Sequence, residues 1–146
     1  MNFKVKDHYF KKAKKDNYLA RSVYKLEEID KKYKVFKKGD RVVDLGYHPG
    51  SWMQYTSKAI GESGKAIGID IRPLNKTLLT LKNVKIFEKD IFDVQVPKDL
   101  EEDDYFDVLI SDMAPNTTGI KSVDQDRSLN LVEKVFEILP IFLKKD

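Results

Sequence analysis

Four short apolar segments recur along the chain, and each ends in or near an aspartate. They span residues 42–45, 66–69, 84–87 and 106–110, and the aspartates are Asp44, Asp70, Asp90 and Asp112. Helix-like segments separate them, and strands that alternate with helices form a parallel sheet with right-handed crossovers. Ligands of such sheets bind outside the carboxyl ends of the strands. We therefore predict an α/β fold, with an open, mainly parallel sheet, helices on both faces and a ligand site at the carboxyl edge.

Hydrophobic periodicity predicts the helices between these strands. We expect helices over 19–34, 51–60 and 75–81, and a long one from a capping Asp124 to about Leu143. The apolar face of the first comprises Val23, Leu26, Ile29 and Tyr33. The apolar face of the long helix comprises Leu129, Val132, Val135, Phe136 and Leu139.

The length of 146 residues and a hydrophobic content of 41% indicate one domain with a real core. The absence of cysteine excludes disulfides, thiolate zinc sites and cysteine nucleophiles. The two histidines and the scattered carboxylates show no metal-ligand spacing, so we expect no metal. No apolar run is long enough for a membrane helix and no signal peptide is evident, so we expect a soluble cytoplasmic protein.

Charge divides the chain into two parts. Residues 1–41 contain 14 Lys/Arg and 6 Asp/Glu, a net charge of +8, whereas residues 42–146 contain 13 and 18, a net charge of −5. This asymmetry favours a polyanionic partner such as nucleic acid, although a solvated lysine-rich surface is the alternative. We divide the single domain, residues 1–146, into a basic arm and helix, 1–38, and an α/β body, 39–146.

The turn after the first strand, residues 44–52, has the sequence DLGYHPGSW. It matches neither the dinucleotide pattern G-x-G-x-x-G nor a P-loop, which argues against a pyrophosphate ligand. Asp70 is placed to accept hydrogen bonds from two ribose hydroxyls, and Asp90 from an exocyclic amine such as that of adenine. A ligand with adenosine but no phosphate, S-adenosylmethionine, fits this pattern, whereas NAD would require the missing turn.

Three segments resemble the FtsJ/RrmJ family of ribosomal RNA ribose 2′-O-methyltransferases. They are YLARSVYKL at 18–26, VVDLGYHPGSW at 42–52 and SDMAPN at 111–116. The resemblance implies a Rossmann-like methyltransferase fold with strand order 3-2-1-4, and S-adenosylmethionine as cofactor. The implied cofactor contacts are Gly46, Gly50 and Trp52 on the methionine side, Asp70 on the ribose, Asp90 on the adenine and Asp112 near the reacting centre. For Trp52, packing in the core is the alternative.

The family uses a catalytic Lys-Asp-Lys-Glu set, in which the first lysine matches Lys25 and the aspartate matches Asp112. A neutral lysine can take the proton of a ribose hydroxyl if burial and nearby positive charge lower its pKa. Arg21 precedes Lys25 by four residues, so both would lie on one helix face, an arrangement that suits phosphate contact better than helix stability.

The resemblance implies methylation of a uridine ribose in large-subunit ribosomal RNA, and a partner that is this RNA or the large ribosomal subunit. We expect the complete form to be a monomer. Tyr9 and Tyr18 would stack on bases or pack onto the domain. Basic residues of the arm would follow the RNA backbone: Lys4, Lys6, Lys11, Lys12, Lys14 and Lys15.

The family continues beyond the long helix into a G-G-x-F-V-x-K strand, and its later strands carry the second lysine and the glutamate. The sequence of this chain ends at Asp146, where that strand would begin. Two interpretations follow: a fragment of a longer enzyme, or a natural short form that binds RNA without catalysis. A nucleotide-dependent oxidoreductase is a third possibility, against which the missing G-x-G-x-x-G argues.

Overall fold

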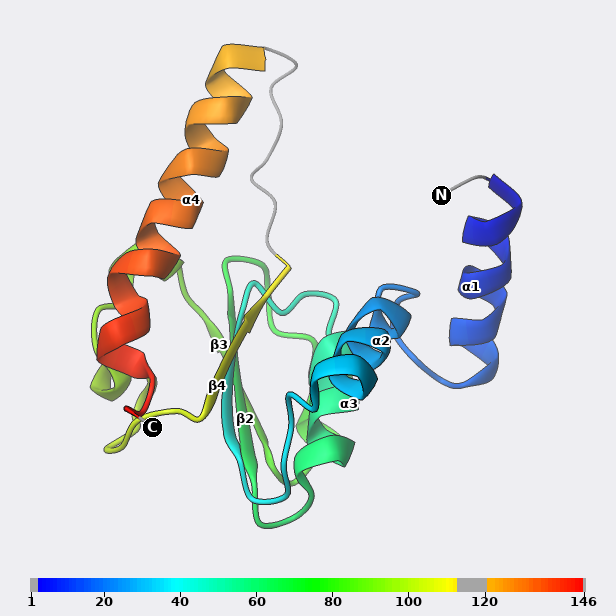
Figure 1. Cartoon of the computed structure of the whole chain (residues 1–146), viewed down its shortest axis with the longest axis horizontal. Helices are drawn as coiled ribbons and strands as arrows, with labels where there is room; N and C mark the ends of the chain where they lie inside the picture. Colours follow the sequence, from blue (N-terminus) through cyan, green and yellow to red (C-terminus); the bar gives the residue numbers. More distant parts are fainter. Residues whose placement is uncertain (1–2, 113–120, 146) are drawn as a thin grey trace.

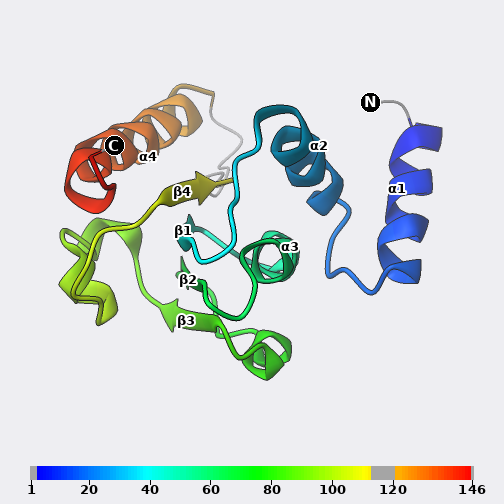
Figure 2. The same ribbon diagram turned by 60° about the horizontal axis from the view of Figure 1, so that its bottom comes forward.

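The computed structural model describes residues 3–112 and 121–145, with side chains for 7–112 and 129–145. Four strands form one sheet in the order β3-β2-β1-β4, and every pairing is parallel, as predicted. Figure 2 shows these strands side by side, with helices on both faces of the sheet. The strands are β1 (Arg41–Leu45), β2 (Lys65–Asp70), β3 (Val84–Glu88) and β4 (Val108–Ser111).

Two helices, α2 and α3, cover one face of the sheet, and α4 lies on the other face (Figures 1 and 2). The first helix, α1, lies beyond α2 and away from the sheet. The helices are α1 (Phe3–Lys15), α2 (Val23–Tyr33), α3 (Ser51–Ile60) and α4 (Lys121–Phe142). Three short 3-10 helices complete the chain: η1 (Lys76–Thr80), η2 (Ile91–Asp93) and η3 (Pro97–Leu100). None of the described helices is long and apolar enough to cross a membrane.

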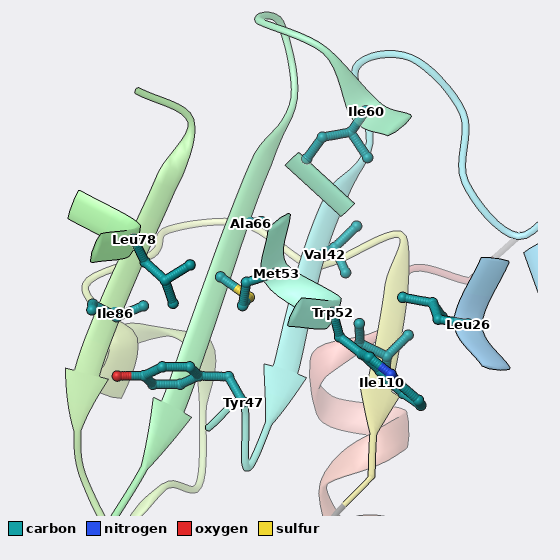
Figure 3. Packing of buried hydrophobic residues seen from close by; sticks show 10 residues of the cluster. All are labelled: Leu26, Val42, Tyr47, Trp52, Met53, Ile60, Ala66, Leu78, Ile86 and Ile110. Atoms are coloured by element: carbon teal, nitrogen blue, oxygen red, sulfur yellow. The ribbon is translucent and has the colours of Figure 1, made fainter. Parts of the chain in front are cut away.

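The alternation of side chains along β1 divides the core into two layers. Val42 belongs to the cluster beneath α2 and α3, whereas Val43 and Leu45 belong to the cluster beneath α4. Figure 3 shows the first cluster, in which Trp52 lies beside Ile110. Asp44 has the same parity as Val42, so its side chain leaves β1 on the α2 and α3 side.

The helix α2 begins four residues later than predicted. The side-chain amide of Gln54, on α3, bonds the backbone just before it: Leu19 N donates to Gln54 Oε1 at 2.9 Å, and Gln54 Nε2 donates to Asn17 O at 3.2 Å. The expected helix face shared by Arg21 and Lys25 was therefore wrong, because Arg21 precedes the helix. Tyr33 was also misplaced, because it is exposed rather than part of the buried face.

The predicted apolar face of α4 was largely wrong. Leu129, Val132 and Phe136 are exposed, whereas Ile138 and Phe142 are fully buried. Lys134 occupies the buried face, where a long aliphatic stem can lie along apolar surface. A hydrophobicity pattern counts a lysine as polar, so the pattern assigned the apolar face of α4 to the wrong side of the helix. Leu131 and Val135 complete the packed face, and the expected cap Asp124 lies outside the described side chains.

The end of α4 is attached to the segment before β4. Phe142 stacks on Phe106 with ring centroids 5.9 Å apart, and Phe106 N donates to Phe142 O at 2.7 Å. Leu143 then pairs with Phe106 in a parallel bridge. At the amino edge of the sheet, the buried Glu102 carboxylate pairs with Arg41 at 2.8 Å and Lys65 at 2.7 Å. These contacts hold the loop before β4, and they lie at the end of the sheet opposite the predicted site.

Candidate active site

The carboxyl edge of the sheet carries all four predicted aspartates. Asp44 is the fourth residue of β1, Asp70 is the last of β2, and Asp112 follows β4 directly. Asp90 lies two residues beyond β3, as the N-cap of η2. The parallel register therefore brings together carboxylates that are as many as 68 positions apart in the sequence.

The turn between β1 and α3 is built around two glycines in conformations that other residues rarely adopt. Gly46 has φ of 76° and Gly50 has φ of 124°. Between them, Tyr47 turns into the core and covers β2 so closely that a Cβ at Gly68 would lie 2.8 Å from its ring. The Tyr47 hydroxyl accepts a hydrogen bond from Asn75 N at 3.3 Å. The Tyr47 side chain thus packs between the turn and β2.

Asp70 joins this turn to the segment after β2. Its Oδ2 accepts a hydrogen bond from His48 N at 3.0 Å, and its Oδ1 accepts one from Arg72 N at 2.9 Å. The side chains of Arg72 and His48 also meet, with Nη1 3.0 Å from Nδ1. Because a guanidinium only donates, Nδ1 accepts in this contact. Each carboxylate oxygen keeps a second lone pair for a ligand.

Asp90 also keeps acceptor capacity. Its Oδ1 accepts a hydrogen bond from Phe92 N at 3.0 Å, and the side chain is exposed. Two large apolar side chains stand exposed beside these aspartates: Ile71 follows Asp70, and Phe92 lies two residues after Asp90. Sequence reasoning missed both. An apolar residue directly after the aspartate was a usable signal for Ile71 but not for Phe92, because the residue directly after Asp90 is the buried Ile91.

Lys25 and Asp112 come together from distant parts of the chain. Lys25 Nζ on α2 lies 3.5 Å from Asp112 Oδ1 after β4, and the two side chains are 64% and 46% exposed. A pair this exposed contributes little to stability, about 0–1 kcal/mol. Its surroundings differ from those that the base chemistry requires, because Lys25 is exposed and its partner is negative. The geometry makes Lys25 a hydrogen-bond donor held by a carboxylate.

Trp52 is part of the core. Its side chain is 8% exposed, and the indole Nε1 donates to Ser22 O at 3.0 Å, which joins α3 to the residue before α2 (Figure 3). The structure thus gives Trp52 a packing role, and its contact with the cofactor stays a prediction.

Asp44 is the most deeply buried of the four aspartates, with 1% of its surface exposed. Within the described residues, its Oδ2 has no hydrogen-bond partner. Burial raises the pKa of this carboxyl well above its usual range, and the negative charges of Asp112 and Asp70 raise it further. Sequence reasoning placed Asp44 at the edge but gave it no role.

The side chains at this edge fit the chemistry of S-adenosylmethionine. Asp70 and Asp90 offer acceptors for hydroxyls and an amine, and exposed apolar groups stand beside them. The half-exposed Asp112 offers negative charge to a cationic ligand, and the unpartnered Asp44 oxygen offers a buried acceptor. In the described part of the chain, no group of three His, Cys, Asp or Glu could hold a metal ion. The rest of the SDMAPN motif, residues 113–116, lies outside the described residues.

Comparison with known proteins shows which family this chain resembles. The sequence model of the FtsJ-like methyltransferases matches residues 18–146. A Bdellovibrio bacteriovorus protein named ribosomal RNA large subunit methyltransferase E is 47% identical over 149 residues, which cover 100% of this chain and 74% of the relative. This chain is thus shorter than that relative.

Solved structures of methyltransferases resemble this fold. A Plasmodium falciparum protein assigned as a ribosomal RNA methyltransferase superposes with a TM-score of 0.69 at 28% identity, over 87% of this chain and 73% of that one. A SAM-dependent methyltransferase from Aquifex aeolicus superposes with a TM-score of 0.50 at 28% identity, over 69% and 55%. These findings confirm the predicted fold and the predicted cofactor, S-adenosylmethionine. The chain therefore belongs to the FtsJ-like methyltransferase family.

Proposed function

We propose that this chain transfers a methyl group from S-adenosylmethionine to a ribose 2′-hydroxyl, at a uridine of large-subunit ribosomal RNA. The observation that carries the proposal is the contact of Lys25 with Asp112 at 3.5 Å, beside the edge that holds Asp70 and Asp90. It joins the basic N-terminal part, where RNA would lie, to the cofactor edge. The name of the Bdellovibrio bacteriovorus relative supports the choice of RNA.

The cofactor residues keep their predicted roles in this proposal. The Asp70 carboxylate, fixed by His48 N and Arg72 N, accepts the two ribose hydroxyls through its remaining lone pairs. Asp90 accepts from the adenine amine, while Ile71 and Phe92 offer apolar surface to the base. Gly46 and Gly50 let the backbone approach the methionine part.

The bound cofactor supplies an electrophilic methyl group on a sulfonium. Lys25 donates a hydrogen bond to the ribose oxygen, and Asp112 holds the lysine in place. In this role Lys25 positions the nucleophile and stabilises negative charge on its oxygen. We assign the proton acceptor to none of the described residues, because Lys25 lacks the burial and the positive neighbour that a lysine base needs.

The helix α1 supplies a basic surface for the RNA backbone. Lys11, Lys14 and Lys15 are exposed on it, while Lys12 lies over the Tyr24 ring at 4.2 Å. Tyr9 and Tyr18 both pack against Tyr24, at 5.5 and 6.2 Å, so packing is the role that the structure gives them. The side chains of Lys4 and Lys6 lie outside the described residues. We expect a cytoplasmic protein that is a monomer in its complete form.

Methyl transfer to purified large ribosomal subunits tests this proposal. With labelled S-adenosylmethionine we expect label in a uridine 2′-O-methyl group, identified by nuclease digestion and mass spectrometry. Lys25→Ala and Asp112→Asn should each lower the rate by at least about tenfold, since both remove a positioning contact. The matched control is Lys31→Ala, because Lys31 lies on the same helix but pairs with Glu27 at 3.2 Å. Equal loss in all three variants, or label on a base, would contradict the assignment.

A second candidate is an RNA-binding module without catalysis. The exposure of Lys25 favours it, because the described edge holds no buried lysine to serve as base. It predicts salt-dependent binding of ribosomal RNA with no label transferred, a result that separates the two candidates.

A further inference from the structure

We infer that Asp44 is a proton-releasing counter-charge for the cofactor: it holds a proton in the free protein and releases it when cationic S-adenosylmethionine binds. This inference rests on the proposed function, because it needs the cofactor at the carboxyl edge. Asp44 is the aspartate of the carboxyl edge to which neither the sequence motifs nor the catalytic contacts assign a role. The inference assigns it one.

The position of Asp44 is the first support. Its side chain is 1% exposed, and it leaves β1 on the side where the glycine turn begins, two residues further on. Its Oδ2 has no hydrogen-bond partner, and no ion pair reaches it within the described residues. A buried carboxylate without a partner is costly, so such a group is normally neutral or paired with a cation.

The charged groups around Asp44 are the second support. Asp112 at the end of β4 and Asp70 at the end of β2 act on it with the same sign. Lys25, the cation that α2 brings to this edge, contacts Asp112 instead. The next element, α3, carries no charged residue before Lys58 in its last turn.

A second cation of this edge, Arg72, forms no ion pair among the described residues. The side chain of Arg72, in the segment after β2, contacts Nδ1 of His48 at 3.0 Å. The free protein therefore gathers three carboxylates here with a single ion-pairing cation, Lys25, among the described residues. This arrangement favours a proton on the most buried of the three, and burial is the main reason that the pKa of Asp44 is raised.

The cofactor supplies positive charge, which Asp44 lacks in the free protein. S-adenosylmethionine carries a sulfonium and an α-ammonium, and an opposite charge nearby favours the ionised form of a carboxyl group. On binding, the O–H bond of the Asp44 carboxylic acid breaks and the proton passes to the solvent buffer. The carboxylate that remains is the counter-charge of the cofactor. No oxidant, reductant or further reactant is needed.

Proton counting by calorimetry tests the inference. S-adenosylmethionine is titrated into the protein at pH 7 in phosphate and in Tris, whose ionisation enthalpies differ, and the dependence of the observed enthalpy on the buffer gives the protons released. We expect up to one proton from the wild type and almost none from Asp44→Asn. Between pH 6 and 8, the affinity of the wild type should rise with pH, by at most about tenfold per unit for one proton.

The matched control is Asp103→Asn, an exposed aspartate paired with Lys98 in the loop before β4. It should release as many protons as the wild type. Tight binding without proton release, or equal release from Asp44→Asn and the wild type, would overturn the inference and leave the proposed function standing. Failure of the folded wild type to bind S-adenosylmethionine would overturn both.

A measurement on the wild type alone tests the inference even if Asp44→Asn fails to fold. Infrared difference spectra, with and without S-adenosylmethionine, report the carbonyl stretch of a protonated carboxylic acid. We expect that band to disappear on binding and a carboxylate band to replace it. A spectrum without loss of the acid band would refute proton release at Asp44.

Discussion

At the scale of single residues, the four aspartates at the carboxyl edge differ in what holds them. Asp70 bonds two backbone N–H groups, Asp90 caps η2, Asp112 meets Lys25, and Asp44 is buried without a partner for its Oδ2. Their common location was predictable from the parallel arrangement of strands. Their separate environments were not, because these depend on backbone groups and helices that meet only in the folded chain.

The burial of Asp44 makes stability depend on pH. Its folded pKa lies above the ordinary value of 3.8, so the folded state holds a proton that the unfolded chain has lost. This contribution to stability is present at low pH and is lost as the pH rises from about 4 toward the folded pKa. Asp44→Asn removes this dependence.

We expect Asp44→Asn to gain stability relative to the wild type as the pH is raised from 5 to 8, measured as the urea midpoint at each pH. Asp103→Asn is the control, because the hydrogen bond and positive charge of Lys98 lower the pKa of that exposed carboxyl and outweigh the opposing effect of desolvation. A constant difference between Asp44→Asn and the wild type across this range would contradict the burial argument.

At the scale of elements, the strands were predicted better than the helix faces. Each predicted strand overlaps the observed one, because a run of buried apolar residues is short and bounded by turn residues. The start of α2 was missed because Gln54, far along the chain, bonds the backbone before it. The buried face of α4 was missed because Lys134 lies within it.

Two phenylalanines on α4 test which face packs against the sheet. Phe142 is fully buried and stacked on Phe106, whereas Phe136 is 67% exposed. Phe142→Ala should lower the free energy of unfolding by about 3–5 kcal/mol, and Phe136→Ala should change it by less than about 0.5 kcal/mol. Urea denaturation of both variants measures the difference. Similar costs at the two positions would contradict the observed packing of α4 through Phe142.

At the scale of the whole molecule, one contact between the basic N-terminal part and the acidic body lies at the carboxyl edge of the sheet. Lys25 lies on α2 and Asp112 follows β4, so their contact joins the two parts of opposite net charge. Composition predicted the charge division, and the motifs singled out Lys25 and Asp112, which the structure brings together. The docking of α1 through Tyr9 and Tyr24 was not predictable, because aromatic residues in a basic segment serve equally well for packing and for base stacking.

The central claim is that the carboxyl edge of this chain binds S-adenosylmethionine through Asp70. Calorimetric titration of the wild type and of Asp70→Asn, with folding checked by circular dichroism, tests it most directly. We predict saturable one-to-one binding by the wild type and an affinity lowered about 10- to 100-fold in Asp70→Asn, the loss expected when hydrogen bonds to a charged acceptor are removed. No binding by the folded wild type, or equal affinity in Asp70→Asn, would contradict the claim.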